Sequence, residues 1–187
     1  RPTHTVFIET PPPFVVAEIG AAHNGSLPRL YRLIEAAIAA GADAVKFQCY
    51  EPKSLAEARG GADKIVRWNG KDWRLLDLYI AGQTPRAWFP DVVDYCRRRK
   101  IVWFSSVFDV GGVDFLETLG CPALKISSFE LTNLPLIEKA ASTGKPLILS
   151  TGMASDEQIK MALAATITQG YSPNVMYHGD CAVLHCV

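Results

Sequence analysis

Short apolar runs alternate with amphipathic segments along most of this chain. The runs predict buried strands at 14–20, 44–49, 101–106, 146–152 and 182–187, and at the start of 123–130. Between them, apolar residues recur at helical spacing. The strands are continuously apolar rather than alternating, which is typical of a parallel sheet buried on both faces. The pattern therefore predicts an α/β fold in which strands and helices alternate about six times.

Capping residues indicate where several helices begin and end. Ser26 followed by Pro28 predicts a helix start, and Gly41 predicts the end of that helix. The run Ser155-Asp156-Glu157-Gln158 is a capping box. Residues 51–83 show no clear period, and we interpret them as a long loop followed by a short helix. A loop of this length inside a compact domain usually serves function.

Two architectures fit this order of elements: a doubly wound sheet and a (β/α)₈ barrel. No GxGxxG motif follows the first strand, so a dinucleotide fold lacks its fingerprint. A barrel typically needs about 250 residues. Six βα units in 187 residues would leave a barrel two units short. Residue 1 is Arg and Val187 lies inside an apolar run, which indicates a fragment of a longer product.

Composition limits the classes of function. Lys+Arg and Asp+Glu both number 19, so the formal net charge of zero gives no support for binding nucleic acid or a membrane surface. No apolar run approaches the roughly 20 residues that span a bilayer, and residues 1–13 do not read as a signal peptide. The five cysteines form no CxxC pair, and we expect reduced core thiols in a cytoplasmic protein. They are Cys49, Cys96, Cys121, Cys181 and Cys186.

Polar side chains follow nearly every predicted strand. They are Glu18, His23, Asn24, Lys46, Gln48, Ser105, Ser106, Asp109, Lys125, Ser127, Ser128, Glu130, Ser150, Thr151 and His185. The carboxyl ends of parallel strands share one rim, which carries the active site in such folds. A single Ser or Thr there is usually a cap, and Lys125 alone could extend to water. Two lysines near one rim, with hydroxyls around them, predict a site for a phosphate or carboxylate.

A metal site has little support in the sequence. His178, Cys181, His185 and Cys186 lie close together along the chain. However, His185 and Cys186 would point to opposite faces of a strand. We therefore assign no metal ligand to this chain.

Four stretches resemble the sialic acid synthase family in order and with similar spacing, and the match extends over nearly the whole chain from about Phe14. They are Ala17-Glu18-Ile19-Gly20 with His23-Asn24-Gly25, then 41–48, 125–130 and 144–154. This family includes N-acetylneuraminate, legionaminate and pseudaminate synthases. Ser128-Phe129-Glu130, with Trp68 and Gly70-Lys71, is closer to the pseudaminate branch.

The resemblance implies a TIM-barrel transferase of carbohydrate biosynthesis. Such an enzyme condenses phosphoenolpyruvate with an N-acetylated amino sugar in its open-chain aldehyde form and releases phosphate. By position, the phosphate and carboxylate of phosphoenolpyruvate would be held by Lys46, Lys125, Ser128 and Ser150, with help from Ser106. Both lysines would then count as catalytic residues.

The resemblance also implies two residues that bind the sugar and one further catalytic residue. Gln48 and Glu130 would contact the sugar. Glu18 would lie near the reacting carbons, where it could handle a proton or activate water.

The resemblance also implies parts that this chain does not carry. A divalent metal, Mn²⁺ or Mg²⁺, is expected to polarise the aldehyde as a Lewis acid, with histidine ligands beyond Val187. The C-terminal antifreeze-like domain, which reaches into the partner subunit of a homodimer, would also be missing. Ser106-Val107-Phe108-Asp109 replaces the usual Thr-Pro-Phe-Asp. We therefore expect a lead-in at 1–13 and, at 14–187, a partial synthase-type TIM barrel truncated after about six βα units.

Two other functions stay open. One is a class I aldolase that uses Lys125 as a Schiff-base nucleophile. The other is a non-catalytic, truncated relative that only binds or scaffolds. The sequence does not show which amino sugar is used, because much of its pocket would lie outside the chain.

Overall fold

Six parallel strands form the main sheet of this protein, whose computed structural model describes residues 12–167 and 181–185. Their spatial order is β1-β2-β5-β6-β7-β8. The strands are β1 (Val16–Glu18), β2 (Ala44–Cys49), β5 (Val102–Val107), β6 (Leu124–Ile126), β7 (Leu147–Ser150) and β8 (Cys181–Leu184). Each strand pairs in parallel with its neighbour in this order.

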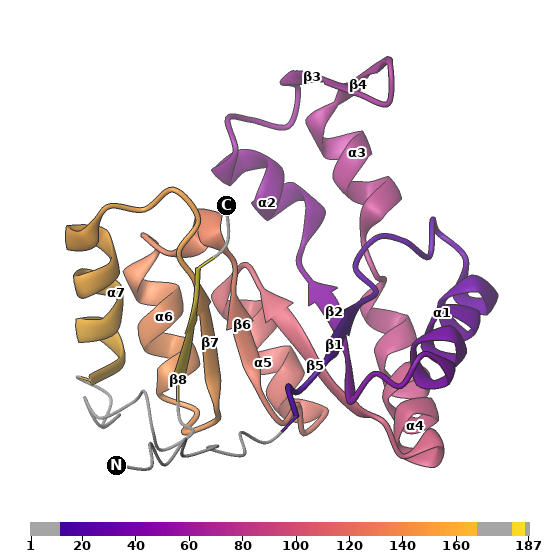
Figure 1. The fold of residues 1–187 in the computed structure, drawn as a ribbon. Helices are drawn as coiled ribbons and strands as arrows, with labels where there is room; N and C mark the ends of the chain where they lie inside the picture. Colours follow the sequence, from indigo (N-terminus) through magenta and orange to yellow (C-terminus); the bar gives the residue numbers. More distant parts are fainter. Residues whose placement is uncertain (1–11, 168–180, 186–187) are drawn as a thin grey trace, which may run out of the picture.

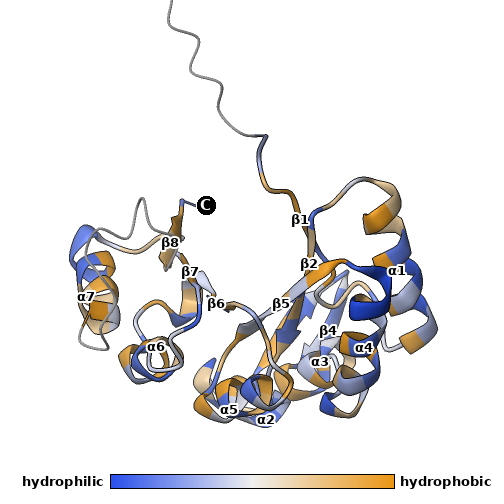
Figure 2. Ribbon diagram, turned by 90° about the horizontal axis from the view of Figure 1, so that it is seen from below, coloured by the Kyte–Doolittle hydropathy of each residue, from blue (hydrophilic) through white to orange (hydrophobic). Residues whose placement is uncertain are grey.

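The helices lie along the outer side of a curved sheet, and the inner side is open (Figures 1 and 2). They are α1 (Leu27–Ala39), α4 (Phe89–Arg99), α5 (Val110–Thr118), α6 (Leu134–Ala141) and α7 (Asp156–Ile167). A doubly wound sheet reverses its strand order and carries helices on both faces. The sequential order and one-sided helices therefore identify a half-barrel of the TIM type, which confirms the α/β barrel prediction.

Helix ends follow the predicted capping residues. The Ser26 hydroxyl accepts a hydrogen bond from the Arg29 backbone N–H at 3.3 Å, at the start of α1. At the start of α7, the Gln158 N–H donates to Ser155 Oγ and the Ser155 N–H donates back to Gln158 Oε1. This reciprocal pair is a capping box, as the sequence predicted.

The short helix predicted at the end of 51–83 is present, but the long loop predicted before it is wrong, because that part of the segment is ordered. The segment contains α2 (Pro52–Ala58), an antiparallel hairpin of β3 (Ile65–Trp68) and β4 (Lys71–Arg74), and α3 (Leu75–Gly82). Asn69 and Gly70 turn the hairpin with φ angles of 50° and 74°, the Asn-Gly signature of a tight turn. The hairpin strands are short and mostly exposed, so no apolar alternation marked them. We call residues 51–83 the cap, because they lie beyond the carboxyl ends of the strands (Figure 1).

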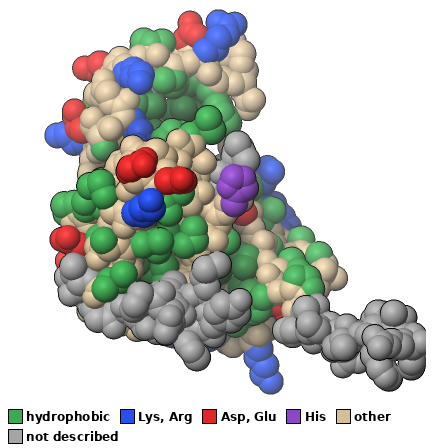
Figure 3. Space-filling model, turned by 60° about the vertical axis from the view of Figure 1, so that its left-hand side comes forward, with side chains coloured by type: hydrophobic (Ala, Val, Ile, Leu, Met, Phe, Trp, Pro, Cys, Tyr) green, Lys and Arg blue, Asp and Glu red, His purple; other side chains and the backbone are tan. Residues whose placement is uncertain are grey.

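The basic run at 97–100 ends α4 and is accounted for by surface ion pairs. Arg98 pairs with Asp94, and Arg99 Nη2 lies 2.6 Å from Glu35 Oε2. On the face drawn in Figure 3, acidic and basic side chains are interspersed. Within the described residues, no helix is long and apolar enough to span a bilayer.

Four cysteines are free and buried, as predicted: Cys49, Cys96, Cys121 and Cys181. Burial raises the pKa of each thiol, to about 12 for Cys96 and about 11 for the other three. These thiols therefore stay protonated and unreactive at neutral pH. Cys186 lies outside the described residues.

Candidate active site

Strand register places predicted site residues side by side on one face of the sheet. Glu18 of β1 pairs with Lys46 of β2. Two residues along β2, Gln48 pairs with Ser106 of β5, which in turn pairs with Lys125 of β6. Paired residues of neighbouring strands project to the same face, and so do residues two apart on one strand. All five side chains therefore share the concave face of the half-barrel.

A sixth predicted site residue lies on the same face, on β7. Lys125 of β6 pairs with Ile148 of β7, and Ser150 lies two residues after Ile148 on β7. Ser150 therefore joins the concave face as well. The opposite face is buried beneath the helices through Val45, Phe47, Trp103, Ser105, Leu124, Ile126, Leu147 and Leu149. Six of the eight predicted site residues thus share one face, which the sequence alone could not show because it gives no register between strands.

Lys46 lies at the centre of a small polar cluster. Its ammonium group pairs with the Glu18 carboxylate and donates a hydrogen bond to Ser106 Oγ at 3.3 Å. Burial, followed by the nearby positive charge of Lys125, lowers the pKa of Lys46 to about 8. A lowered pKa beside a second cation is what a site prepared for an anion would show before the anion binds.

Lys125 acts on two groups that lie far apart in sequence. Its charge lowers the pKa of Lys46 and also opposes the rise in the pKa of Glu130. Lys125 therefore lies within electrostatic range of both Lys46 and Glu130, on a strand whose register places it next to Ser106. Its positive charge thus belongs to the candidate site.

Ser150 contributes a buried hydroxyl that has no hydrogen-bond partner among the described residues. Its side chain is only 1% exposed. Buried hydroxyls in native proteins nearly always have a partner, so an unpartnered one requires an explanation. A bound anion on the concave face would supply an acceptor for it.

Ser128 lies outside β6, in a 3₁₀ turn formed by Ser128–Glu130. It packs against Gly152, just after β7, where φ is +51°. A Cβ atom at Gly152 would lie 2.5 Å from Ser128 Cβ. The glycine therefore allows the chain after β6 to approach the chain after β7 closely, which holds Ser128 against Gly152.

Replacing Gly152 with alanine is expected to destabilise the fold by about 2–3 kcal/mol, because positive-φ strain adds to the clash with Ser128. Gly144→Ala is the matched control. Its φ is +67°, but a Cβ there would meet nothing within 4 Å. Urea denaturation of both variants measures the difference. Equal losses of stability would show that the Ser128 contact contributes nothing.

Glu130 is buried at 4% exposure and has two partners. Arg59 Nη2 pairs with Glu130 Oε1, and the Ser127 hydroxyl donates to Glu130 Oε2. Burial raises the pKa of Glu130 to about 6, against the opposing effects of Arg59 and Lys125. Glu130 therefore links the end of β6 to helix α2 of the cap.

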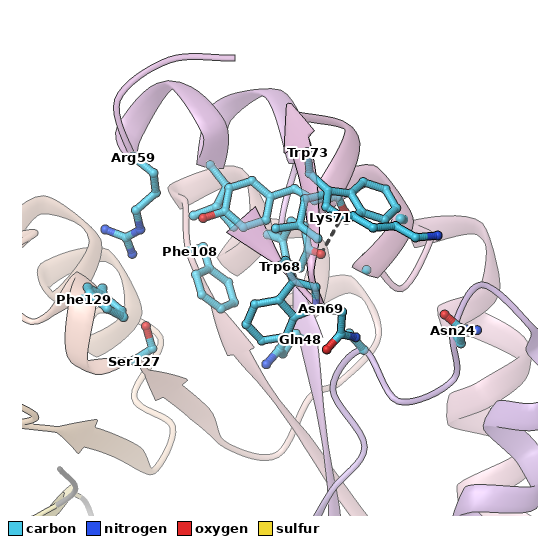
Figure 4. Close-up of a pocket in the computed structure, with 17 residues that line it drawn as sticks. Asn24, Gln48, Arg59, Trp68, Asn69, Lys71, Trp73, Phe108, Ser127 and Phe129 are labelled. Atoms are coloured by element: carbon cyan, nitrogen blue, oxygen red, sulfur yellow. Dashed lines mark hydrogen bonds between the residues drawn. The ribbon is translucent and has the colours of Figure 1, made fainter. Parts of the chain in front are cut away.

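A pocket of about 850 Å³ lies between the cap and the strand ends (Figure 4). Six aromatic side chains line it: Tyr50, Trp68, Trp73, Tyr79, Phe108 and Phe129. Gln48, Asn24, Asn69, Arg59 and Lys71 add polar groups. Of the predicted sugar-binding residues, Gln48 lines this pocket. Glu130 does not line it, although its neighbours Ser127 and Phe129 do.

Sequence reasoning missed Arg59 and the aromatic wall. Arg59 is one of many cap cations, and no pattern distinguishes it before its pairing with Glu130 is seen. The length of 51–83 was the one available signal, because long segments in compact domains are usually functional. That interpretation located the region but not the residues.

His23 has a structural role. It is fully buried, and its Nδ1 accepts a hydrogen bond from the Gly25 N–H at 3.1 Å. Its Nε2 then carries the proton and donates to Thr84 Oγ1 at 3.1 Å. Burial lowers the pKa of His23, so the ring stays neutral and ties the β1 loop to the start of the segment before α4.

A metal does not fit the residues at this site. Within 12–167 and 181–185, no three His, Cys, Asp or Glu side chains lie together as a metal site. Cys181 is buried in the core and His185 is exposed. His178 and Cys186 lie outside the described residues.

Comparison with known proteins identifies the family. The profile of the NeuB family matches residues 33–187. The chain belongs to the NeuB family. It is 34% identical over 176 residues to the spore coat polysaccharide biosynthesis protein SpsE of Bacillus subtilis, covering 94% of this chain and 45% of SpsE. It is 36% identical over 156 residues to the pseudaminic acid synthase of Helicobacter pylori, covering 82% of this chain and 45% of that enzyme.

Solved structures of NeuB relatives share the half-barrel. The N-acetylneuraminic acid synthetase of Leptospira borgpetersenii serovar Hardjo-bovis, in complex with citrate, superposes with a TM-score of 0.79 at 29% identity. The match covers 95% of this chain and 55% of that structure. This NeuB chain therefore spans about half the length of the relatives that it matches.

Proposed function

We propose that this NeuB chain carries the phosphoenolpyruvate site of a nonulosonic acid synthase of the sialic and pseudaminic type. The proposal rests on two lysines, Lys46 and Lys125, that lie near each other on the same concave face. Lys46 and Lys125 lie close enough for one charge to lower the pKa of the other. Serine hydroxyls surround them at Ser106 and Ser150. Phosphoenolpyruvate, with its phosphate and carboxylate, would neutralise both lysines.

The proposed reaction forms one carbon–carbon bond, forms one carbon–oxygen bond from water and breaks the carbon–oxygen bond to phosphate. The enol carbon C3 of phosphoenolpyruvate attacks the aldehyde carbon of an open-chain N-acetylated amino sugar, and the aldehyde oxygen takes up a proton. Water then adds to the cation at C2 and loses a proton. The remaining C2 hydroxyl then gives its proton to the departing phosphate as the bond from C2 to the bridging oxygen breaks, so inorganic phosphate leaves and a 2-keto acid remains.

The two lysines would bind the anionic groups and stabilise the charge that develops on departing phosphate. Ser106, Ser128 and Ser150 would donate hydrogen bonds to the same oxygens. Because the strands fix these groups before substrate arrives, little reorganisation is needed during the reaction.

Glu18 would act at the reacting carbons, and Gln48 would bind the sugar. Glu18 shares the face with Lys46, and its side chain is 46% exposed, so a substrate can reach its carboxylate. It would accept the proton from the attacking water. Gln48 lines the aromatic pocket and would hydrogen-bond a sugar hydroxyl. The described residues hold no group of three His, Cys, Asp or Glu side chains that could bind a metal, and no step here is assigned to a metal.

Phosphoenolpyruvate binding is expected to weaken as the pH rises above about 8. The pKa of Lys46 is lowered to about 8, so the ammonium form that attracts an anion is present below that value and is lost above it. Affinity should then fall by about tenfold per pH unit, since one proton is needed for tight binding. Isothermal titration of phosphoenolpyruvate into the chain at pH 7, 8 and 9 measures this.

Lys46→Arg is the control for this prediction, because arginine stays charged throughout that range. The affinity of the Lys46→Arg variant for phosphoenolpyruvate should be nearly constant between pH 7 and 9. The groups facing Lys46 are Glu18, Ser106 and Lys125. A wild-type profile as flat as that of the arginine variant would contradict the assignment of Lys46 to the anion site.

A further inference from the structure

The cap contributes two cations, Arg59 and Lys71, to a pocket that six aromatic side chains also line. Arg59, at the end of α2, is one of the pocket-lining residues, and a quarter of its side chain (25%) remains exposed. In Figure 4 its guanidinium extends toward Phe129 and Ser127, beside the cavity. This placement makes Arg59 a candidate to contact whatever occupies the pocket.

Three contacts fix the position of Arg59. Its Nη2 pairs with Glu130, and its guanidinium carbon lies 4.8 Å from the centre of the Phe129 ring. Its backbone carbonyl accepts a hydrogen bond from Lys64 Nζ at 3.1 Å. Glu130 is held in turn by the Ser127 hydroxyl. A planar guanidinium held in this way loses little further entropy when it binds a ligand.

The Arg59–Glu130 pair favours an uncharged acceptor. The buried carboxylate of Glu130 already balances the charge of Arg59, so the pair presents no net charge to the pocket. A guanidinium has five N–H donors, and the Glu130 contact uses the Nη2 group. Donors that remain can bind a neutral oxygen, such as an amide carbonyl.

The aromatic wall adds a second requirement on the ligand. Tyr50, Phe108 and Phe129 offer apolar ring surface against which a methyl group can be buried. Trp73 also lines the pocket, and its buried Nε1–H has no acceptor among the described residues. An acylamido group matches both features, because it combines a methyl group with a carbonyl oxygen that accepts hydrogen bonds.

We propose that Arg59 is a specificity-determining residue that donates a hydrogen bond to the acyl oxygen of the amino sugar, with Glu130 as its positioning residue. This inference rests on the proposed function and names the sugar group that the pocket selects. It assigns Glu130 an indirect role, acting on the sugar through Arg59.

The test compares two neutral sugars that differ in the acylamido group. N-acetylmannosamine and mannose are titrated into the chain, with the fluorescence of Trp68 and Trp73 as the readout. Arg59→Gln should weaken N-acetylmannosamine binding by about 10- to 100-fold, the usual effect of losing a hydrogen bond from a charged donor. Mannose binding should change by less than about twofold. Arg59→Lys should restore part of the preference, since it keeps one charged donor.

Arg67→Gln is the matched control. Arg67 also lies in the cap, but it pairs with Asp72 at the surface and does not line the pocket. This variant should keep the full preference for N-acetylmannosamine. Phosphoenolpyruvate affinity should be unchanged in every one of these variants.

Two results would overturn the inference and leave the proposed function standing. One is an equal loss of affinity for both sugars in Arg59→Gln, which would mean that Arg59 only supports the cap. The other is a loss of phosphoenolpyruvate affinity with the sugar preference intact. If the unmodified chain bound neither phosphoenolpyruvate nor either sugar, the proposed function itself would fail.

Discussion

Lys125→Met is expected to weaken phosphoenolpyruvate binding by about 100-fold. The substitution keeps an unbranched side chain of nearly the same length but removes the charge that acts on both Lys46 and Glu130. Charge-assisted hydrogen bonds to an anion contribute about 1.5–3 kcal/mol each, and Lys125 would reach a polyanion in a largely buried site. Isothermal titration of phosphoenolpyruvate at pH 7 measures the loss.

The same substitution at a surface lysine is the control. Lys139 of α6 pairs with Asp114 across the outer helices, with Nζ and Oδ1 2.7 Å apart. Lys139→Met should leave the affinity unchanged. If Lys125→Met bound phosphoenolpyruvate as well as the control, Lys125 would be a structural lysine rather than an anchor for the substrate.

Phe47→Ala is expected to destabilise the fold by about 3–5 kcal/mol. Phe47 is fully buried on the helix-covered face of β2, between Lys46 and Gln48 in sequence. Its ring packs edge-on against the ring of Phe89, with 6.2 Å between the ring centroids. The ring of Phe89 packs in the same way against Phe115, with 5.7 Å between the centroids. Removing the ring leaves a cavity where α4 and α5 pack on the sheet. Chemical denaturation followed by circular dichroism measures the loss.

Met161→Ala provides the comparison on the outer surface. Met161 lies on α7 and is 55% exposed, so this substitution should lower the free energy of unfolding by less than about 0.5 kcal/mol. Similar effects for the two substitutions would mean that the aromatic cluster does not carry the packing of the half-barrel. A large effect for Phe47 alone would show that the strand with the site residues depends on the helix layer behind it.

Much of this fold could be predicted because its signals are local. Continuous apolar runs such as 44–49 locate buried strands, and Ser26 and Ser155 mark helix starts through short-range hydrogen bonds. The choice between a barrel and a doubly wound sheet could not be made from these signals. It depends on strand order and on which face the helices cover, and both are set by contacts between distant segments.

The candidate site was only half visible in the sequence. Lys46 and Lys125 drew attention because charged residues inside apolar strands are rare. The cap was misread, since β3 and β4 are short and exposed and only Asn69-Gly70 marked their turn. Arg59 carried no local signal at all, because its importance comes from a partner in a distant turn.

The stoichiometry of phosphate release tests the central claim most directly. The whole protein is incubated with phosphoenolpyruvate and an N-acetylated amino sugar, and in a parallel sample with borohydride. We expect one phosphate to be released for each 2-keto acid formed, and we expect this release to require the sugar. The peptide that contains Lys125 should carry no added mass. Mass added to Lys125 by a carbonyl substrate, without phosphate release, would contradict the central claim and identify a Schiff-base aldolase. Binding of both ligands with no product would identify a non-catalytic relative.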